Sequence, residues 1–264
     1  MLQRLRDMTG HLRRAAPESA AAPRDRDGAA TTLVACVGDS ITRGSVSADW
    51  VGLLRDRLRA GGVEVINEGV NGNLAWNVGQ RLDGVIARRP DVVTLLVGTN
   101  DVNATLDERS QRSYRRGQHL PVRATLPWYE ANVAAILDRL AAQTEARVLV
   151  LDLPMLGEDP SSELNRRVGE YNAALRAICA DRAVECLPLH DRLTALLPPG
   201  HRPPPYTGDR ALMVRAILSH HVLRRSWDDI SARNGLAVLT DHIHLNDTAA
   251  AVVADLIEGS LSRS

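Results

Sequence analysis

Short apolar runs that each end in polar or glycine residues are the feature that most constrains the fold of this chain. The first run, residues 33–37, is followed at once by Gly38, Asp39 and Ser40. Each run is too short for a helix and is bounded by turn residues, so it predicts a buried strand. Three later runs have the same form, at residues 63–67, 92–97 and 236–239.

Helical stretches separate these runs and complete the predicted fold. Apolar residues recur there at helical spacing, with glycine or proline near several of the ends. We expect helices at residues 49–60, 76–88, 127–143, 161–180 and 247–261, and two further strands at 147–152 and 183–187. Strands that alternate with helices predict an α/β fold, a three-layer αβα sandwich around a doubly wound parallel sheet.

The predicted domain is single and spans residues 31–264. Residues 1–30 are rich in Arg, Ala and Pro and are expected to form a partly disordered extension or a short helix. Two stretches exceed what a minimal fold needs, at 102–125, which is arginine-rich, and at 198–231, which begins with prolines. The second stretch predicts a helix from Asp209 onward that is either a lid or an ordered surface segment. In the lid interpretation Leu223 and Trp227 contact substrate.

The charge balance and hydropathy of the sequence argue against two classes of binding partner. The chain has 264 residues, and 32 basic residues balance 32 acidic ones, so neither nucleic acid nor an anionic membrane is favoured. No stretch approaches the ~20 apolar residues of a membrane span, and we expect a cytoplasmic protein without integral membrane insertion. Every basic residue is arginine and phenylalanine is absent, which favours a GC-rich bacterial genome. No cofactor or metal site is expected, and the oligomeric state cannot be read from the sequence.

The polar residues that end the apolar runs have the chemistry of an acyl-transfer site. In a parallel sheet the carboxyl ends of the strands share one edge, where ligands bind. Ser40, a glycine-rich turn at 67–72, Asn100 and the pair Asp241 and His244 can therefore meet there. A serine, a base and oriented donors are what nucleophilic acyl transfer requires.

The four blocks resemble the SGNH hydrolase superfamily, also called GDSL esterases and lipases. They are Gly38-Asp39-Ser40, Asn67-Glu68-Gly69-Val70-Asn71-Gly72, Gly98-Thr99-Asn100-Asp101 and Asp241-His242-Ile243-His244. Each block is weak alone, but their joint order is specific, and the resemblance covers residues 33–257. It implies a flavodoxin-like fold. Ile41 replaces the leucine that commonly follows the serine, which is a conservative departure.

Carried over motif by motif, the resemblance implies a role for each residue. Ser40 would be the nucleophile, His244 its general base and Asp241 the residue that orients His244. The backbone amides of Ser40 and Gly72 and the side-chain amide of Asn100 would form the oxyanion hole. Neutral imidazole titrates close to neutral pH, and a carboxylate on its far nitrogen fixes the tautomer.

Each residue also has a structural interpretation. Ser40 could cap a helix, Asn100 could be a turn residue and Asp101 could cap a helix. Asp39 is placed beside the substrate, but a structural hydrogen-bonding role fits it better than catalysis. His242 is expected to flank the base rather than replace it.

Three functions remain open at this point. The first is a serine esterase that hydrolyses a carboxylic, thio- or acetyl ester of a small or lipid-like substrate through an acyl-enzyme at Ser40. The second is an acyltransferase on the same fold, in which an alcohol or amine takes the acyl group. The third is a non-catalytic binding module, which the intact set of four blocks disfavours.

Overall fold

A sheet of five parallel strands in the order β2-β1-β3-β4-β5 forms the centre of the protein. The computed structural model describes residues 32–208 and 211–263. The strands are β1 (Thr32–Gly38), β2 (Val63–Gly69), β3 (Val92–Leu96), β4 (Arg147–Leu151) and β5 (Glu185–Leu187). Each is joined to the next by a helical crossover, as parallel pairing requires. The predicted α/β class and doubly wound sheet are confirmed.

Alternating side chains of each strand feed two hydrophobic clusters. On β1, Val34 and Cys36 belong to one cluster, whereas Leu33, Ala35 and Val37 belong to the other. This period of two follows from the pleat of a strand. Both faces of the sheet are therefore covered, which explains why the strands read as continuous apolar runs.

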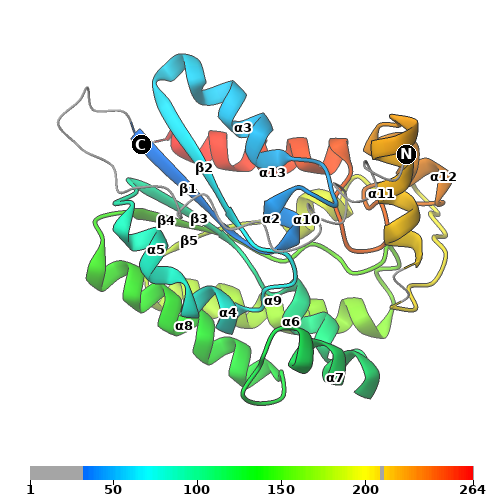
Figure 1. Ribbon diagram of the computed structural model, residues 1–264, viewed down its shortest axis with the longest axis horizontal. Coiled ribbons are helices and arrows are strands. Elements are labelled where there is room, and N and C mark those ends of the chain that lie inside the picture. The colour runs from blue at the N-terminus through cyan, green and yellow to red at the C-terminus, as the bar shows by residue number, and fades with distance from the viewer. Residues whose placement is uncertain (1–31, 209–210, 264) are drawn as a thin grey trace.

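Helices form the two outer layers. Helices α3 (Trp50–Leu58), α10 (Leu189–Thr194) and α13 (Asp247–Leu261) contribute to the first cluster. The helices of the second cluster are α4 (Ala75–Gln80), α5 (Leu82–Ala87), α8 (Leu126–Gln143) and α9 (Glu163–Asp181). Figure 1 shows α3 and α13 on one side of the sheet and α8 and α9 on the other.

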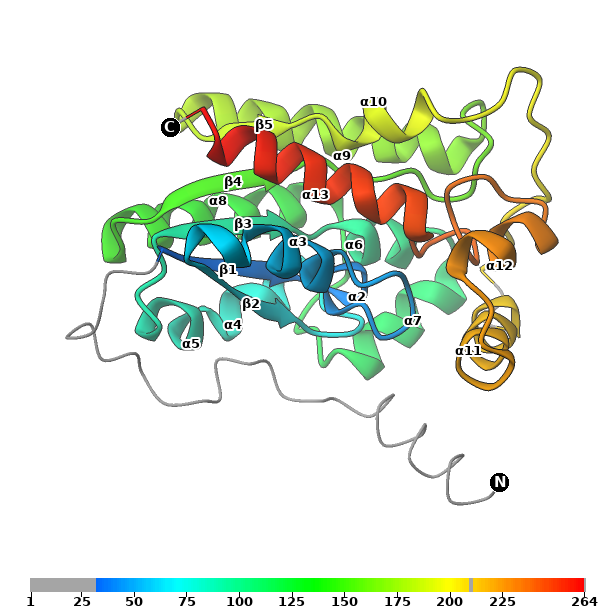
Figure 2. The same ribbon diagram turned by 90° about the horizontal axis from the view of Figure 1, so that it is seen from above.

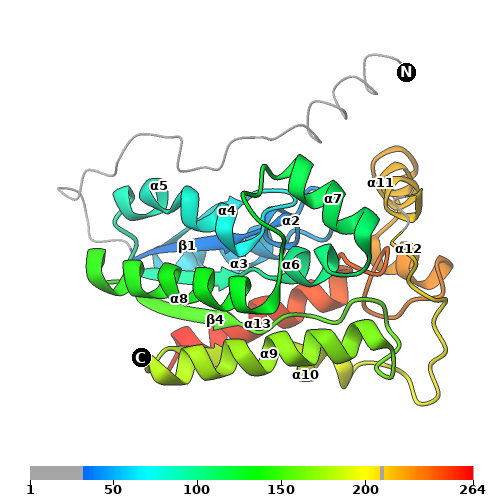
Figure 3. The same ribbon diagram turned by 90° about the horizontal axis from the view of Figure 1, so that it is seen from below.

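The remaining helices are short or lie toward the carboxyl ends of the strands. They are α2 (Ser40–Arg43), α6 (Thr99–Ala104), α7 (Glu108–Gly117), α11 (Ala211–Leu223) and α12 (Trp227–Arg233). Figure 2 shows α11 and α12 at the end toward which β1 points, and Figure 3 shows α7 and α11 at that same end from the opposite side. Residues 102–125 and 198–231 thus supply helices near the predicted site.

Three predicted elements are wrong. The helix expected at 76–88 is two helices, because the chain turns at Arg81 (φ −113°), whose side chain is drawn toward the strand ends. The strand expected at 236–239 does not join the sheet, and only Leu239 forms a bridge, to Leu245. Its backbone amides are instead bonded to a buried glutamate, as described below.

The helix predicted from Asp209 is also two helices. It breaks at Arg224, which has a left-handed φ of 53°. As a result Leu223 is 57% exposed, whereas Trp227 is 4% exposed, lies in the first cluster and stacks on His220. In the described part of the chain no helix is long and apolar enough to cross a membrane. The predicted extension at 1–30 lies outside the described residues, and the division into domains stays a prediction.

The opposite burial of these two side chains gives a first prediction. Trp227→Ala should lower the free energy of unfolding by about 3–5 kcal/mol, because it leaves a cavity in the core. Leu223→Ala, the matched control, should change it by less than about 0.5 kcal/mol. Urea unfolding followed by circular dichroism measures both. Similar values for the two variants would contradict the arrangement of α11 and α12.

Candidate active site

Ser40 lies at the carboxyl end of β1 as the first residue of α2. The residue that caps this helix is Asp39, whose Oδ1 accepts a bond from the Ile41 amide at 2.9 Å. Ser40 is therefore not the helix cap, and its hydroxyl is left for another partner. That partner is His244, whose Nε2 lies 3.0 Å from Ser40 Oγ.

His244 is held between the serine and a carboxylate. Its Nδ1 lies 2.8 Å from Oδ2 of Asp241, and Oδ1 of the same carboxylate accepts the amide of His244 at 2.9 Å. An Nδ1–H bonded to Asp241 leaves Nε2 as the acceptor that faces Ser40, which is the tautomer a general base needs. All three side chains are buried.

The two partners shift each other's pKa. Burial alone would lower the pKa of His244, but the charge and hydrogen bond of Asp241 outweigh it, so the pKa is raised above the ordinary value. Burial would raise the pKa of Asp241, but His244 and two backbone amides lower it overall. The pair therefore favours an imidazolium beside a carboxylate.

Gly72 follows β2 in a left-handed conformation, with a φ of 77°. A Cβ at this position would lie 2.4 Å from Nε2 of Gln118, the residue that ends α7. The positive φ favours glycine here, and a side chain would in addition require the end of the flexible Gln118 side chain to move. The Gln118 side chain thus fills the space beside the predicted oxyanion donor.

Asn100 lies in the first turn of α6, directly after β3. Its Nδ2 donates to Asp39 Oδ2 at 3.2 Å and to the carbonyl of Asn73 at 3.0 Å. Both amide hydrogens are engaged, so an oxyanion would have to share or displace one of these acceptors. Burial raises the pKa of Asp39 to about 6. Asp101, the neighbour of Asn100, accepts the first amide of α4 at 3.1 Å and so caps that helix.

Sequence reasoning missed Arg81, which ties the strand ends together. Its Nη2 donates to the carbonyl oxygens of Gly38 (2.9 Å) and Glu68 (2.8 Å), and its Nε donates to Asn73 Oδ1 (2.9 Å). Gly38 and Glu68 lie at the ends of β1 and β2, and Asn73 lies in the loop that carries Gly72. An arginine within a predicted helix gives no signal of this role.

Sequence reasoning also missed Glu158, which holds the segment before Asp241. Its carboxylate accepts three backbone amides, those of Ala237, Val238 and Leu239, at 2.7–2.8 Å. His201 Nε2 lies 2.7 Å from the same carboxylate. The Glu158 side chain thus replaces the neighbouring strand that the apolar run at 236–239 had predicted.

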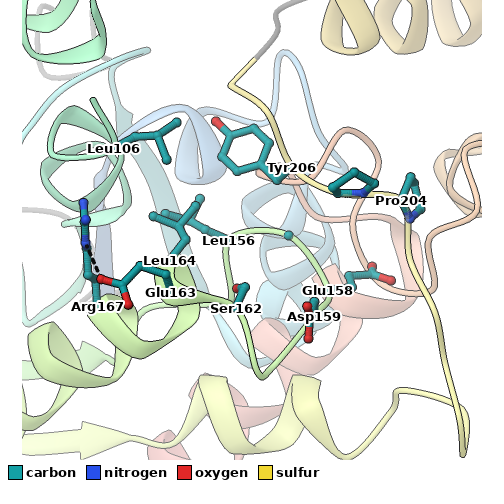
Figure 4. A pocket seen from close by; sticks show the side chains of 12 residues that line it. Leu106, Leu156, Glu158, Asp159, Ser162, Glu163, Leu164, Arg167, Pro204 and Tyr206 are labelled. Carbon is teal, nitrogen blue, oxygen red and sulfur yellow. Dashed lines mark ion pairs between the residues drawn. The ribbon is translucent and has the colours of Figure 1, made fainter. Parts of the chain in front are cut away.

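A cavity of about 290 Å³ lies beside the loop of His242. Its lining includes the side chains of Tyr206, Leu156 and the ion pair Arg167–Glu163 (Figure 4). The ring of Tyr206 packs on His242 with 5.5 Å between centroids. The four predicted catalytic and oxyanion side chains are not among its lining residues.

The structure brings Ser40, Asn100, Asp241 and His244 together with Asp39. Leu223 and Trp227 do not line the cavity, and their predicted contact with substrate stays a prediction. Across residues 32–208 and 211–263, no group of three or more His, Cys, Asp or Glu side chains is arranged to hold a metal ion.

One known family covers most of this sequence. The family model described as "GDSL-like Lipase/Acylhydrolase family" matches residues 36–252. The chain belongs to this family. The resemblance seen in the sequence is confirmed, and the protein is a carboxylic ester hydrolase. A search of curated proteins found no match.

Solved structures of similar fold include three esterases or hydrolases. The acetylxylan esterase Axe2 from Geobacillus stearothermophilus is 17% identical, with 90% of this chain and 96% of that chain covered and a TM-score of 0.62. The acetyl xylan esterase AlAXEase is 21% identical, with 87% and 99% covered and a TM-score of 0.59. LAE5, an alpha/beta hydrolase from the metagenome of Lake Arreo, Spain, is 17% identical, with 89% and 97% covered and a TM-score of 0.60. At these identities the likeness shows the fold.

The pKa shifts of the His244–Asp241 pair predict a pH dependence. A general base works when deprotonated, so kcat/KM for an ester should rise with pH and reach half its maximum above the usual histidine value of about 6.5. In Asp241→Asn burial is opposed only by the weaker charge of Asp39, so the rising limb should move to lower pH while the maximum falls roughly 10³–10⁴-fold. Initial rates across pH measure both, with the exposed-site variant His119→Asn as control. If kcat/KM reached half its maximum at the same pH in Asp241→Asn as in the parent protein, the pairing of His244 with Asp241 would be contradicted.

Proposed function

We propose that the protein is a serine esterase that removes short acyl groups, acetyl above all, from hydroxyl compounds. The observation that carries the proposal is a pair of hydrogen bonds through one imidazole. His244 Nε2 lies 3.0 Å from Ser40 Oγ, and His244 Nδ1 lies 2.8 Å from Asp241 Oδ2. A serine hydroxyl becomes nucleophilic when an oriented base can take its proton.

In the proposed reaction Ser40 Oγ attacks the ester carbonyl carbon while His244 Nε2 takes the hydroxyl proton. The tetrahedral oxyanion is held by the amides of Ser40 and Gly72 and by the side chain of Asn100. His244 then returns the proton to the leaving alkoxide, which departs as the alcohol and leaves an acyl-enzyme. Water, deprotonated by His244, attacks the acyl-enzyme, and His244 returns that proton to Ser40 Oγ as the bond to the acyl group breaks and the acid is released.

Two observations support a short acyl group. The Gln118 side chain occupies the space beside Gly72, where a Cβ would already lie 2.4 Å from its Nε2. The similar structures include esterases named for acetylxylan, an acetylated carbohydrate. The comparisons give no support for the acyltransferase alternative. Hydrolysis of p-nitrophenyl acetate, butyrate and octanoate tests chain length, and the highest kcat/KM is expected for acetate.

Covalent labelling tests the nucleophile. A fluorophosphonate should attach to Ser40 and abolish hydrolysis, because His244 activates this hydroxyl alone. Intact mass and peptide mapping locate the adduct. Ser40→Ala should be inactive and unlabelled, whereas Ser47→Ala, at another buried serine, should behave as the parent protein. An adduct on a different residue would refute the assignment of Ser40.

The oxyanion donor is tested by Asn100→Ala. Its kcat should fall about 10²–10³-fold with KM little changed, since the side chain bonds to charge that exists only in the transition state. Asn132→Ala, which removes an amide bonded to the carbonyl of Trp128, is the control and should retain the parent kcat. Steady-state kinetics on the folded variants decide the matter. A near-normal kcat in Asn100→Ala would remove this residue from the hole.

A further inference from the structure

The carbonyl end of the Asn100 side chain has a partner of its own. Tyr114, from α7, donates its phenolic hydrogen to Asn100 Oδ1 at 2.8 Å. With Nδ2 bonded to Asp39 and Asn73, each end of the amide has a defined partner. The Asn100 side chain is therefore held at both ends, and its NH₂ group faces Asp39, the neighbour of Ser40.

The direction of the Tyr114 bond follows from the backbone carbonyl of Asn73, which can only accept and therefore faces Asn100 Nδ2, so that Oδ1 faces Tyr114. Tyr114 therefore gives its own hydrogen to Asn100, and its oxygen accepts a bond from Asn103 Nδ2 at 3.0 Å. Asn103 Oδ1 then faces Tyr206, whose hydroxyl donates to it at 3.0 Å. The bonds thus run one way, from Tyr206 to Asn103, Tyr114 and Asn100.

This hydrogen-bond relay consists of Tyr206, Asn103, Tyr114 and Asn100, which come from α6, α7 and the segment 198–231. Asn100 and Asn103 share one face of α6 at a spacing of three residues and are 5% and 7% exposed. Tyr114 belongs to the segment 102–125 and Tyr206 to the segment 198–231. Both segments beyond the minimal fold therefore reach the predicted oxyanion donor through a phenolic hydroxyl.

We propose that Tyr114 is a positioning residue for the oxyanion hole and that Tyr206 supports it through Asn103. The inference rests on the proposed function, because it gives Asn100 the role of oxyanion donor. Without the Tyr114 hydroxyl, Oδ1 would lose its donor and the amide would be held at its Nδ2 end alone. A hydrogen bond to Oδ1 also polarises the amide and strengthens its N–H as a donor.

The test compares Tyr114→Phe with Tyr171→Phe. Tyr171 is buried, and its hydroxyl has no hydrogen-bond partner among the described residues, so removal of that hydroxyl controls for the loss of a phenol. For p-nitrophenyl acetate, Tyr114→Phe should lower kcat about tenfold with KM within about twofold, less than the loss of the donor itself. Tyr171→Phe should leave both constants within about twofold of the parent values.

A double variant tests the order of the relay. Tyr206→Phe should lower kcat less than Tyr114→Phe, and Tyr114→Phe/Tyr206→Phe should be no slower than Tyr114→Phe alone, because Tyr206 acts through Tyr114. Melting temperatures accompany the kinetics. Additive losses, or a Tyr114→Phe variant as active as Tyr171→Phe, would overturn the proposal.

A readout without turnover separates this inference from the proposed function. In ¹⁵N-labelled protein, the side-chain NH₂ resonances of Asn100, assigned with Asn100→Ala, should shift in Tyr114→Phe and stay in place in Tyr171→Phe. Unchanged resonances would overturn the positioning role whatever the activity. If the parent protein does not hydrolyse esters through Ser40, the proposed function fails, and these resonances still decide whether Tyr114 orients Asn100.

Discussion

The register of three parallel strands is the constraint on which the site depends. Gly38, at the end of β1, is level with Gly69 on β2 and with Leu96 on β3. The loops after these strands therefore start side by side, and they carry Ser40, Gly72 and Asn100. The fit is close, because a Cβ at Gly38 would lie 2.2 Å from Thr42 Oγ1 and 2.4 Å from the carbonyl of Leu96. A larger residue would push α2 and its serine away from β3.

His244, the predicted base, does not follow a strand of the sheet. Residues 236–239 have the apolar character of a strand, yet the amides of residues 237–239 are bonded to the buried carboxylate of Glu158 rather than to a neighbouring strand. A carboxylate that accepts three amides satisfies donors that would otherwise be buried without partners. Its position fixes where the chain turns into Asp241 and His244. The segment resembles a strand in composition because it is buried, and it lacks the pairing that defines one.

The sequence predicted what depends on local pattern. Period and length located the five sheet strands, and the spacing of polar blocks brought Ser40, Asn100 and His244 to one edge. Contacts between distant segments could not be predicted in this way. Tyr114 lies in an arginine-rich stretch that reads as solvated surface, and its bond to Asn100 exists only once α7 packs beside α6. Likewise, the sequence predicts Leu223 and Trp227 on one helix, because the left-handed turn at Arg224 has no local signal.

Because carboxylates surround the site, stabilisation of the oxyanion depends on how the neutral amide groups are oriented. Asp241 and, to a smaller extent, Asp39 raise the pKa of His244, which stabilises the imidazolium that forms when Ser40 loses its proton. The same carboxylates oppose a negative oxyanion close by. Backbone and side-chain amides can stabilise the oxyanion without a cation, but an amide helps only when its N–H points inward. Within the proposed mechanism, a one-way relay of neutral phenols and amides supplies that orientation and adds no further charge to an acidic site.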